Sequence, residues 1–364
     1  MGIERLDIQD FRCFTRVAMT PHSGTNLIIG ANGSGKTSLF EVLAILTDHI
    51  VRGRSVSEAL AYTLTSWDKR DAQRFELDVE GNGGTYRFAL EVQHSGQPSS
   101  RPFIRSESVT FDGDLLYRFA DGQVHLFSED KAPAVFPFRA EQSFLPNVDH
   151  NPYARLAWFK DFVAGIRLLQ PNPFAMALAS PKDEQAFLNR YGTNFAAFYN
   201  YLNAEQPAAR TFLEDRLREV LPGFRNLLFR RHGEDKLLLM EFSGERDSVF
   251  QLNLLNLSEG QRVLLVLYAA ICSLIGNTTV LCVDEPDNFV SLPEIQPWLQ
   301  VLRDSVTQRN AQAILVSHHP EVIDYLALDA VWRFERPAGP VIARRVEADP
   351  SSDLRLSEQI VRGA

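Results

Sequence analysis

The stretch Gly30-Ala31-Asn32-Gly33-Ser34-Gly35-Lys36-Thr37 decides the fold of this 364-residue chain, because it matches the pattern G-x-x-x-x-G-K-[ST]. A short apolar run, 26–29, precedes it, and residues 38–51 with helical spacing follow it. Glycines let consecutive backbone N–H groups curl around a phosphate, and a helix start adds its free N–H groups and positive dipole end. The sequence therefore predicts a triphosphate-binding loop rather than a fortuitous glycine turn.

The residues expected to contact the nucleotide lie in this loop and at the helix start. Lys36 supplies a positive charge for the β- and γ-phosphates, and the Thr37 hydroxyl is expected to bind Mg²⁺. The full set expected to contact the nucleotide here is Gly30, Asn32, Gly33, Ser34, Gly35, Lys36, Thr37 and Ser38.

Two acids end a second apolar run, Val280-Leu281-Cys282-Val283-Asp284-Glu285. Such a run is typical of a buried strand, and in an open α/β sheet ligands bind beyond the carboxyl ends of the strands. We expect Asp284 to hold the magnesium shell and Glu285 to be the catalytic residue that polarises the attacking water. An ordinary strand end with solvated acids is the alternative, and the glycine loop makes it the weaker one.

A third motif, Leu257-Ser258-Glu259-Gly260-Gln261-Arg262, stands directly before an apolar helical run. Ser258 occupies the position of a helix N-cap, so a good helix start explains it without any ligand. The functional interpretation is a second anion site at a helix N-terminus, with Ser258 and Gly260 facing the phosphate.

Composition narrows the class of protein. Hydrophobic residues are 45% and charged residues 23%, which excludes a disordered tail or a fibrous repeat. The net charge of −9 argues against a basic nucleic-acid coat, although a local basic groove stays open. Three scattered cysteines predict neither a zinc site nor a disulfide framework and suit a reducing cytoplasm. The longest nearly apolar run, 263–276, is too short for a membrane span, so we expect a buried helix and no membrane partner.

Strand and helix patterns predict an α/β fold with three parts. Short alternating runs between 74 and 127, separated by Gly- and Asp-Gly turns, predict an antiparallel meander. Helical spacing covers 153–220, and strands then helices alternate from 225 onward, which favours a mainly parallel core sheet. The expected division is 1–145 with the glycine loop and meander, 146–222 as a helical insertion, and 223–364 with the remaining motifs.

The order of these motifs resembles that of the ABC-type ATPases: Walker A at 30–37, signature at 257–262 and Walker B at 280–285. Pro286-Asp287-Asn288 then looks like a D-loop, and Ile314-Leu315-Val316-Ser317-His318-His319 looks like the switch-histidine strand. The opening Phe11-Arg12-Cys13-Phe14 resembles the start of the RecF, SMC and OLD-like branch rather than that of transporters. This chain would be a compact member, without a long coiled coil or a TOPRIM nuclease domain.

The resemblance implies a head-to-tail dimer that encloses two ATP molecules. Each ATP would lie on Lys36 and Thr37 of one copy and under Ser258 and Gly260 of the other. Glu259 replaces the second glycine of the commonest signature, which puts the strength of dimer closure in question. His318 is expected to bond the γ-phosphate, whereas a Ser317–His318 dyad is excluded because neighbours on a strand point to opposite faces.

Two further residues each have a functional and a structural interpretation that stay open. Gln142 is a candidate Q-loop residue that touches Mg²⁺, or a solvated loop glutamine. Arg12 is a candidate nucleotide contact, or a surface arginine.

The resemblance implies an ATP-hydrolysing switch, cytoplasmic, that controls a separate effector such as a nuclease or toxin in antiphage defence or DNA repair. The cluster Arg225, Arg230, Arg231 and His232 leaves DNA open as a partner, although a charge cluster is more often a solvated face. The resting assembly would be a homodimer or larger. Two rivals are a nucleotide-gated scaffold with little turnover and the motor subunit of an ABC transporter.

Overall fold

The computed structural model describes residues 1–94, 101–128, 131–180, 184–275, 279–326, 330–346 and 354–362. They form two compact units, and each is described by itself. The first consists of Met1–Ile166 and Leu326–Asp353, and the second of Arg167–Tyr325 and Leu354–Gly363. These bounds differ from the expected division at 145 and 222, because the first unit continues past the meander and also takes in a segment from far along the chain.

The first unit contains an eight-stranded antiparallel sheet in the order β2-β1-β4-β5-β6-β7-β8-β9. The meander expected between 74 and 127 is present, and its turns carry positive φ angles at Asn82, Asp112 and Asp121, as tight hairpins require. The sequence analysis did not include β2 and β9. The strands are β1 (Gly2–Phe11), β2 (Phe14–Met19), β4 (Ala72–Gly81), β5 (Gly84–Gln93), β6 (Phe103–Phe111), β7 (Asp114–Ala120), β8 (Gln123–Ser128) and β9 (Lys131–Pro137).

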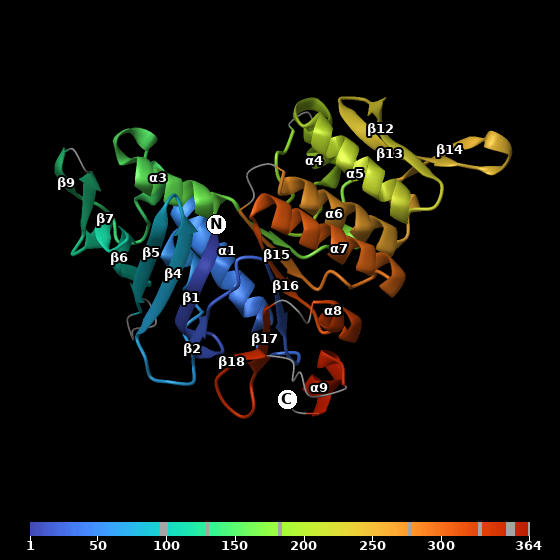
Figure 1. The fold of residues 1–364 in the computed structure, drawn as a ribbon. Coiled ribbons are helices and arrows are strands. Elements are labelled where there is room, and N and C mark those ends of the chain that lie inside the picture. Colours follow the sequence, from blue (N-terminus) through green and yellow to red (C-terminus); the bar gives the residue numbers. More distant parts are fainter. Residues whose placement is uncertain are drawn as a thin grey trace. The chain divides into compact units, whose positions relative to one another are not determined.

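Two helices of the first unit, α1 (Lys36–Arg52) and α3 (His150–Ala164), lie against each other (Figure 1), and both bury apolar residues. The stripe predicted for α1 is buried throughout: Leu39, Val42, Leu43, Leu46 and Ile50. α3 packs on β5, where Tyr86 stacks on Trp158 with ring centroids 5.0 Å apart. The short α2 (Val56–Ala59) follows α1, and the 3-10 turn η1 (Leu145–Asn147) precedes α3.

A buried cluster anchors the far end of α1 to the meander. Glu107 Oε1 lies 3.0 Å from His49 Nε2, and its Oε2 accepts a hydrogen bond of 2.7 Å from the Tyr117 hydroxyl. Burial, followed by the Glu107 charge, raises the pKa of Tyr117 well above its ordinary value, so Tyr117 stays protonated and donates. Glu107 is thus a structural acid.

The strand before the glycine loop, β3 (Thr25–Ile29), pairs in parallel with β17 (Ala330–Glu335), which in turn pairs antiparallel with β18 (Ile342–Val346). All five residues of β3 are buried. That is the expected pattern of a parallel strand covered on both faces.

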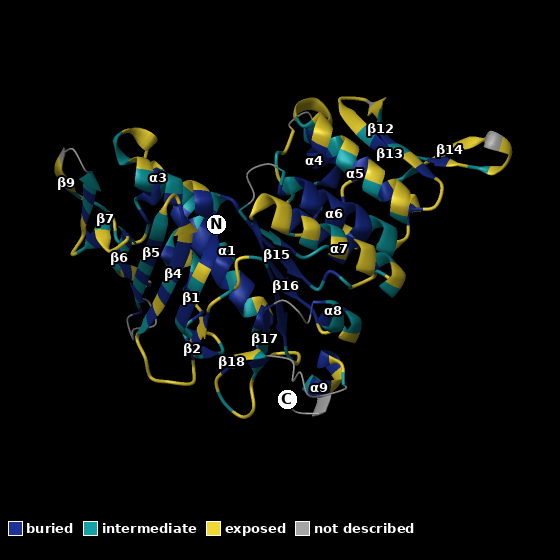
Figure 2. Ribbon diagram, viewed as in Figure 1, coloured by how far each residue is buried: buried dark blue, intermediate teal, exposed yellow. Residues whose placement is uncertain are grey.

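The second unit contains the other parallel pair. β15 (Val280–Asp284) pairs with β16 (Gln312–Val316), and β10 (Ile166–Leu169) lies on the other side of β15. Both β15 and β16 are wholly buried (Figure 2). The helices of this unit are α4 (Phe195–Glu205), α5 (Pro207–Val220), α6 (Glu259–Ser273), α7 (Leu292–Arg309), α8 (Pro320–Tyr325) and α9 (Leu356–Arg362).

The apolar run after Ser258 is a buried helix, as predicted: residues 263–272 of α6 have almost no exposed surface. Cys272 on α6 and Cys282 on β15 are buried and free, and burial raises the pKa of both thiols, which keeps them protonated. No helix among the described residues has the length and apolarity needed to cross a membrane.

The remaining strands of the second unit form a small antiparallel sheet. β13 (Asp235–Ser243) lies between β11 (Ala179–Ser180) and β12 (Phe224–His232), and it also pairs with β14 (Val249–Asn253). The region 146–222 is therefore not wholly helical, because β10 and β11 interrupt it. Short 3-10 turns lie at η2 (Pro173–Ala175), η3 (Glu245–Asp247) and η4 (Leu254–Asn256).

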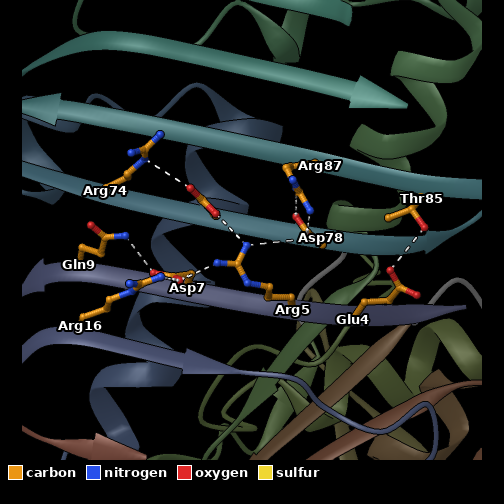
Figure 3. A network of polar contacts seen from close by, with 10 residues as sticks. Glu4, Arg5, Asp7, Gln9, Arg16, Arg74, Asp78, Thr85 and Arg87 are labelled. Atoms are coloured by element: carbon orange, nitrogen blue, oxygen red, sulfur yellow. Dashed lines mark hydrogen bonds and ion pairs between the residues drawn. The ribbon is translucent and has the colours of Figure 1, made fainter. Parts of the chain in front are cut away.

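One face of the large sheet carries a network of ion pairs (Figure 3). Asp7 on β1 stands opposite Glu76 on β4, and two like charges in that position would repel. Arg5 bridges them: its Nη2 lies 2.7 Å from Asp7 and its Nη1 lies 2.8 Å from Glu76. Arg16 also reaches Asp7 at 3.0 Å, and the side chain of Asp7 has no exposed surface.

We predict that Asp7→Asn lowers the free energy of unfolding at pH 7 by about 1.5–3 kcal/mol, the range for hydrogen bonds to a charged group. Burial raises the pKa of Asp7, but hydrogen bonds from Arg16 and Gln9 and the charges of Arg16 and Arg5 outweigh it, so the pKa lies below its ordinary value. The contribution is therefore complete above about pH 5 and is lost as the pH falls through the folded-state pKa.

Urea unfolding of both proteins between pH 3 and 8 measures this difference. Glu4→Gln is the control, because Glu4 is exposed on the same strand and should change stability little at any pH. A difference for Asp7→Asn that stays constant down to pH 3 would contradict the linkage.

Candidate functional site

The glycine loop connects β3 to α1 within the first unit. Gly30, Gly33 and Gly35 have φ angles of +152°, +78° and +94°, in the region that L side chains avoid. Gly35 is the N-cap of α1 and has no side chain with which to cap the helix, and no acid lies in the first turn. The helix start thus presents its N–H groups and positive dipole end to an anion.

The Phe11-Arg12-Cys13-Phe14 segment forms the wall behind this loop. A Cβ at Gly35 would lie 2.5 Å from Phe14 Cε1 and 3.0 Å from Cys13 Sγ, so only glycine fits. At the other end of the loop, a Cβ at Gly30 would collide with the Phe334 carbonyl of β17. Gly33 faces open space. The loop is held at both ends and open in its middle.

The surroundings of Lys36 and Ser34 indicate which ligand the loop can bind. The Lys36 ammonium donates to the carbonyl oxygens of Gly30 (2.6 Å) and Ala31 (3.1 Å), and the residue is 6% exposed. The Ser34 hydroxyl is buried with no hydrogen-bond partner. A buried cation held by two carbonyls of the loop and a buried hydroxyl without a hydrogen-bond partner fit an anion with several oxygens. Of the other expected contacts, Asn32 and Thr37 are exposed and Ser38 is half-buried.

Arg12 lies beside α1. Its guanidinium pairs with Glu41, about one turn beyond Lys36, and lies 5.5 Å from the centroid of the Phe11 ring. Between the two open interpretations, the structure shows a surface arginine with a partner on the helix that begins at the loop.

Acidic residues gather where β15 and β16 of the second unit end. Asp284, the last residue of β15, is 4% exposed and is opposite Val316. Glu285 follows with φ +48°, and its N–H donates to the Val316 carbonyl at 2.8 Å. Its carboxylate lies between two side chains: Oε2 is 2.7 Å from Asn288 Nδ2, and Oε1 is 3.4 Å from His318 Nδ1. Glu285 and His318 are therefore brought together, as expected of residues that act on one group.

Ser317 and His318 point to different partners, which agrees with the exclusion of a dyad. The Ser317 hydroxyl donates to Asp287 Oδ1 at 2.7 Å and accepts from the His319 N–H at 3.0 Å. His319 Nδ1 accepts from the Glu321 N–H at the start of α8, so His319 has a structural role.

The start of α6 is capped as the sequence predicts. The Ser258 hydroxyl accepts from the Gln261 N–H at 3.2 Å, and Gln261 Oε1 accepts from the Ser258 N–H, forming a capping box. Ser258 stays exposed. A Cβ at Gly260 would lie 2.6 Å from the Phe289 carbonyl, so close packing against the D-loop segment requires glycine there.

Gln142 is not placed as a Q-loop residue should be. The carbonyl of its neighbour Glu141 accepts from the N–H of Val56, four residues past the end of α1. α1 has 17 residues and so is about 25 Å long, and the glycine loop is at its other end. The expectation that Gln142 touches Mg²⁺ is therefore not supported.

Gln170 was not singled out in the sequence analysis. It directly follows β10, the strand beside β15, and its Oε1 accepts from Arg190 Nη2 at 3.3 Å. The segment after it lies along the D-loop: Phe174 packs on Phe289 at 5.7 Å, and Arg262 Nη1 donates to the Pro173 carbonyl at 2.8 Å. The carboxyl ends of β10 and β15 therefore share one edge. The sequence signal for this strand is the short, mostly apolar run 166–169 before the Gln170-Pro171 pair. It lies inside the region that the sequence analysis assigned as helical.

The basic residues on β12 do not all lie on one face of the strand. Arg230 and Arg231 are consecutive strand residues and so point to opposite faces, and Arg230 bonds Gln251 Oε1 at 2.6 Å. The Arg225 carbonyl accepts from Arg218. This arrangement favours solvated side chains over one DNA-facing patch.

Comparison with known proteins agrees with this geometry. Residues 25–324 match the family described as "AAA domain, putative AbiEii toxin, Type IV TA system". The chain is 34% identical over 116 residues to the DNA replication and repair protein RecF of Thioalkalivibrio sulfidiphilus and 39% identical over 117 residues to that of Pasteurella multocida. These matches cover 32% of this chain and about three tenths of each relative, 30% and 31%.

Solved SMC heads share the fold. An SMC head bound to the C-terminal winged-helix domain of ScpA has a TM-score of 0.62 at 12% identity, covering 97% of this chain and all of the other. The Pyrococcus furiosus SMC head has a TM-score of 0.57 at 11% identity, covering 99% and 98%. The similarity to RecF proteins and the fold shared with SMC heads agree with the resemblance to the RecF/SMC branch of ABC-type ATPases. Because the family match spans more than half of the sequence, the chain belongs to this AAA-domain family.

Proposed function

We propose that this chain binds ATP with Mg²⁺ and hydrolyses it as a molecular switch. The observation that supports this best is the glycine loop. Its three positive-φ glycines lead into a helix whose N-cap is glycine, the Lys36 ammonium bonds two carbonyls of the loop, and the buried Ser34 hydroxyl has no hydrogen-bond partner. A triphosphate supplies the oxygens that these groups need. Phosphate oxygens would replace the Gly30 and Ala31 carbonyls around Lys36.

The family resemblance assigns the loop and the acidic edge to one nucleotide. Thr37 and Asp284 would hold Mg²⁺, with Gln170 in place of Gln142. When bound, Mg²⁺ neutralises charge on the β- and γ-phosphates. Glu285 would take a proton from the attacking water, because it follows the buried strand directly and its carboxylate is already oriented by two side chains. His318 would bond the γ-phosphate and sense its loss.

The proposed assembly is a head-to-tail homodimer. Ser258 remains exposed although its hydroxyl caps α6, so it can meet a phosphate from outside its own chain. The start of α6 then acts on the nucleotide held by Lys36 of the other copy. A larger assembly of such dimers is compatible with this contact.

The proposed biological role is control of a separate effector. The RecF relatives are named for DNA replication and repair, and the family is named for a toxin of a toxin–antitoxin system. These names support DNA repair and antiphage defence respectively, with a nuclease or toxin as the effector.

We expect wild-type protein to release phosphate from ATP, and Glu285→Gln to lower turnover on the order of 10²- to 10³-fold while keeping ATP affinity, since a general base is lost. Lys36→Ala should abolish ATP binding. Lys69→Ala, which removes an exposed lysine, is the matched control. Equal and negligible phosphate release by wild type and Glu285→Gln would favour the nucleotide-gated scaffold instead.

Mixing two inactive variants tests the shared site. Ser258→Arg should retain ATP binding but lose turnover, and Ser258→Thr should stay active because it keeps the hydroxyl and the cap. Mixing Ser258→Arg with Lys36→Ala should restore up to about a quarter of wild-type turnover, because half of the dimers regain one intact site of two. Turnover that never recovers in the mixture, or full activity of Ser258→Arg, would count against the dimer.

The two glutamines give opposite expectations. Gln170→Ala should lower turnover about tenfold and raise the Mg²⁺ concentration needed for half-maximal rate, because a carbonyl oxygen near the metal is lost. Gln142→Ala should behave as wild type. Mg²⁺ titrations of both variants decide the assignment, and a reversed pattern would return the role to Gln142.

A further inference from the structure

One of the two contacts that orient the Glu285 carboxylate in the function proposed above comes from Asn288. Asn288 Nδ2 lies 2.7 Å from Glu285 Oε2, and the Asn288 N–H also donates to the Glu285 carbonyl at 3.2 Å. An ionised carboxylate only accepts, so the atom that faces it is the amide nitrogen. A hydrogen bond of this kind is charge-assisted and favours one carboxylate orientation.

The exposed Asn288 is held in place by its neighbours. On one side, Asp287 accepts from the buried Ser317 hydroxyl. On the other side, the Phe289 carbonyl lies against Gly260, and its ring packs on Phe174. Phe289 has φ +70°, an uncommon value that such anchoring maintains. The side chain of Asn288 therefore starts from a fixed backbone.

We propose that Asn288 is a positioning residue for Glu285. By occupying Oε2, it fixes the carboxylate rotamer and leaves Oε1 toward His318 and the attacking water. This inference rests on the proposed hydrolysis. It assigns to the third residue of the D-loop segment a role within its own chain, in addition to any contact with a second copy.

Asn288→Asp is the sharpest test, because it keeps the size of the side chain, removes the donor and adds a charge beside Glu285. We expect kcat to fall roughly ten- to a hundredfold, the loss typical of a hydrogen bond to a charged group, with KM for ATP and the ATP affinity unchanged. Asn288→Ala should lose about tenfold on the same grounds. Asn203→Asp, at an exposed asparagine on α4, controls for the added charge.

A second measurement separates positioning from a general effect on folding. In the Glu285→Gln background, Asn288→Asp should change the single-turnover rate by less than about twofold, because residues that act through one group are not additive. Thermal unfolding midpoints of the Asn288 variants should match that of wild type, since the side chain is exposed.

The outcomes are distinct. If Asn288→Asp turns over ATP as fast as the wild type, this inference alone is overturned. The same holds if Asn288→Asp lowers the rate by the same factor in the wild-type and Glu285→Gln backgrounds. A wild-type protein that releases no phosphate overturns the proposed hydrolysis and this inference with it.

Discussion

The N–H groups at the start of α1 set the constraint on which the rest of the proposed nucleotide site depends. A helix leaves its first N–H groups without partners, and proteins normally satisfy them with a capping side chain. Here the preceding residue is glycine, and the Phe14 ring and the Cys13 sulfur leave no space for a larger residue. Glycine brings no capping side chain, so the helix start can offer its N–H groups and its positive dipole end to a bound phosphate.

The second unit holds the Glu285 carboxylate at the end of β15 without burying it. Asp284 is enclosed, whereas Glu285 has turned out of the strand into a left-handed conformation that costs about 1–2 kcal/mol for a non-glycine residue. The backbone bond to Val316 and the side chains of Asn288 and His318 compensate for it. Strain at this position is consistent with a residue placed for chemistry rather than for stability.

Much of this could be predicted from the sequence, because the decisive signals are local. The glycine loop, the apolar run ending in two acids and the Ser258 cap each depend on neighbours within a few residues, and all three structures formed as expected. Errors arose where a signal was short or depended on distant residues. β10 has four residues with an arginine among them, so periodicity did not reveal it, and Gln170 was missed with it. Gln142 had the expected residue type, but only the fold shows which end of α1 it is near.

The pairing of β3 with β17 has a consequence for the order of events during synthesis. About 300 residues separate these strands, yet the Phe334 carbonyl defines one end of the glycine loop. On the ribosome, β3 and α1 emerge early but cannot acquire this neighbour until the segment 330–335 has left the exit tunnel. For most of translation, the glycine loop of the nascent chain therefore lacks the neighbour that packs against Gly30 in the finished fold.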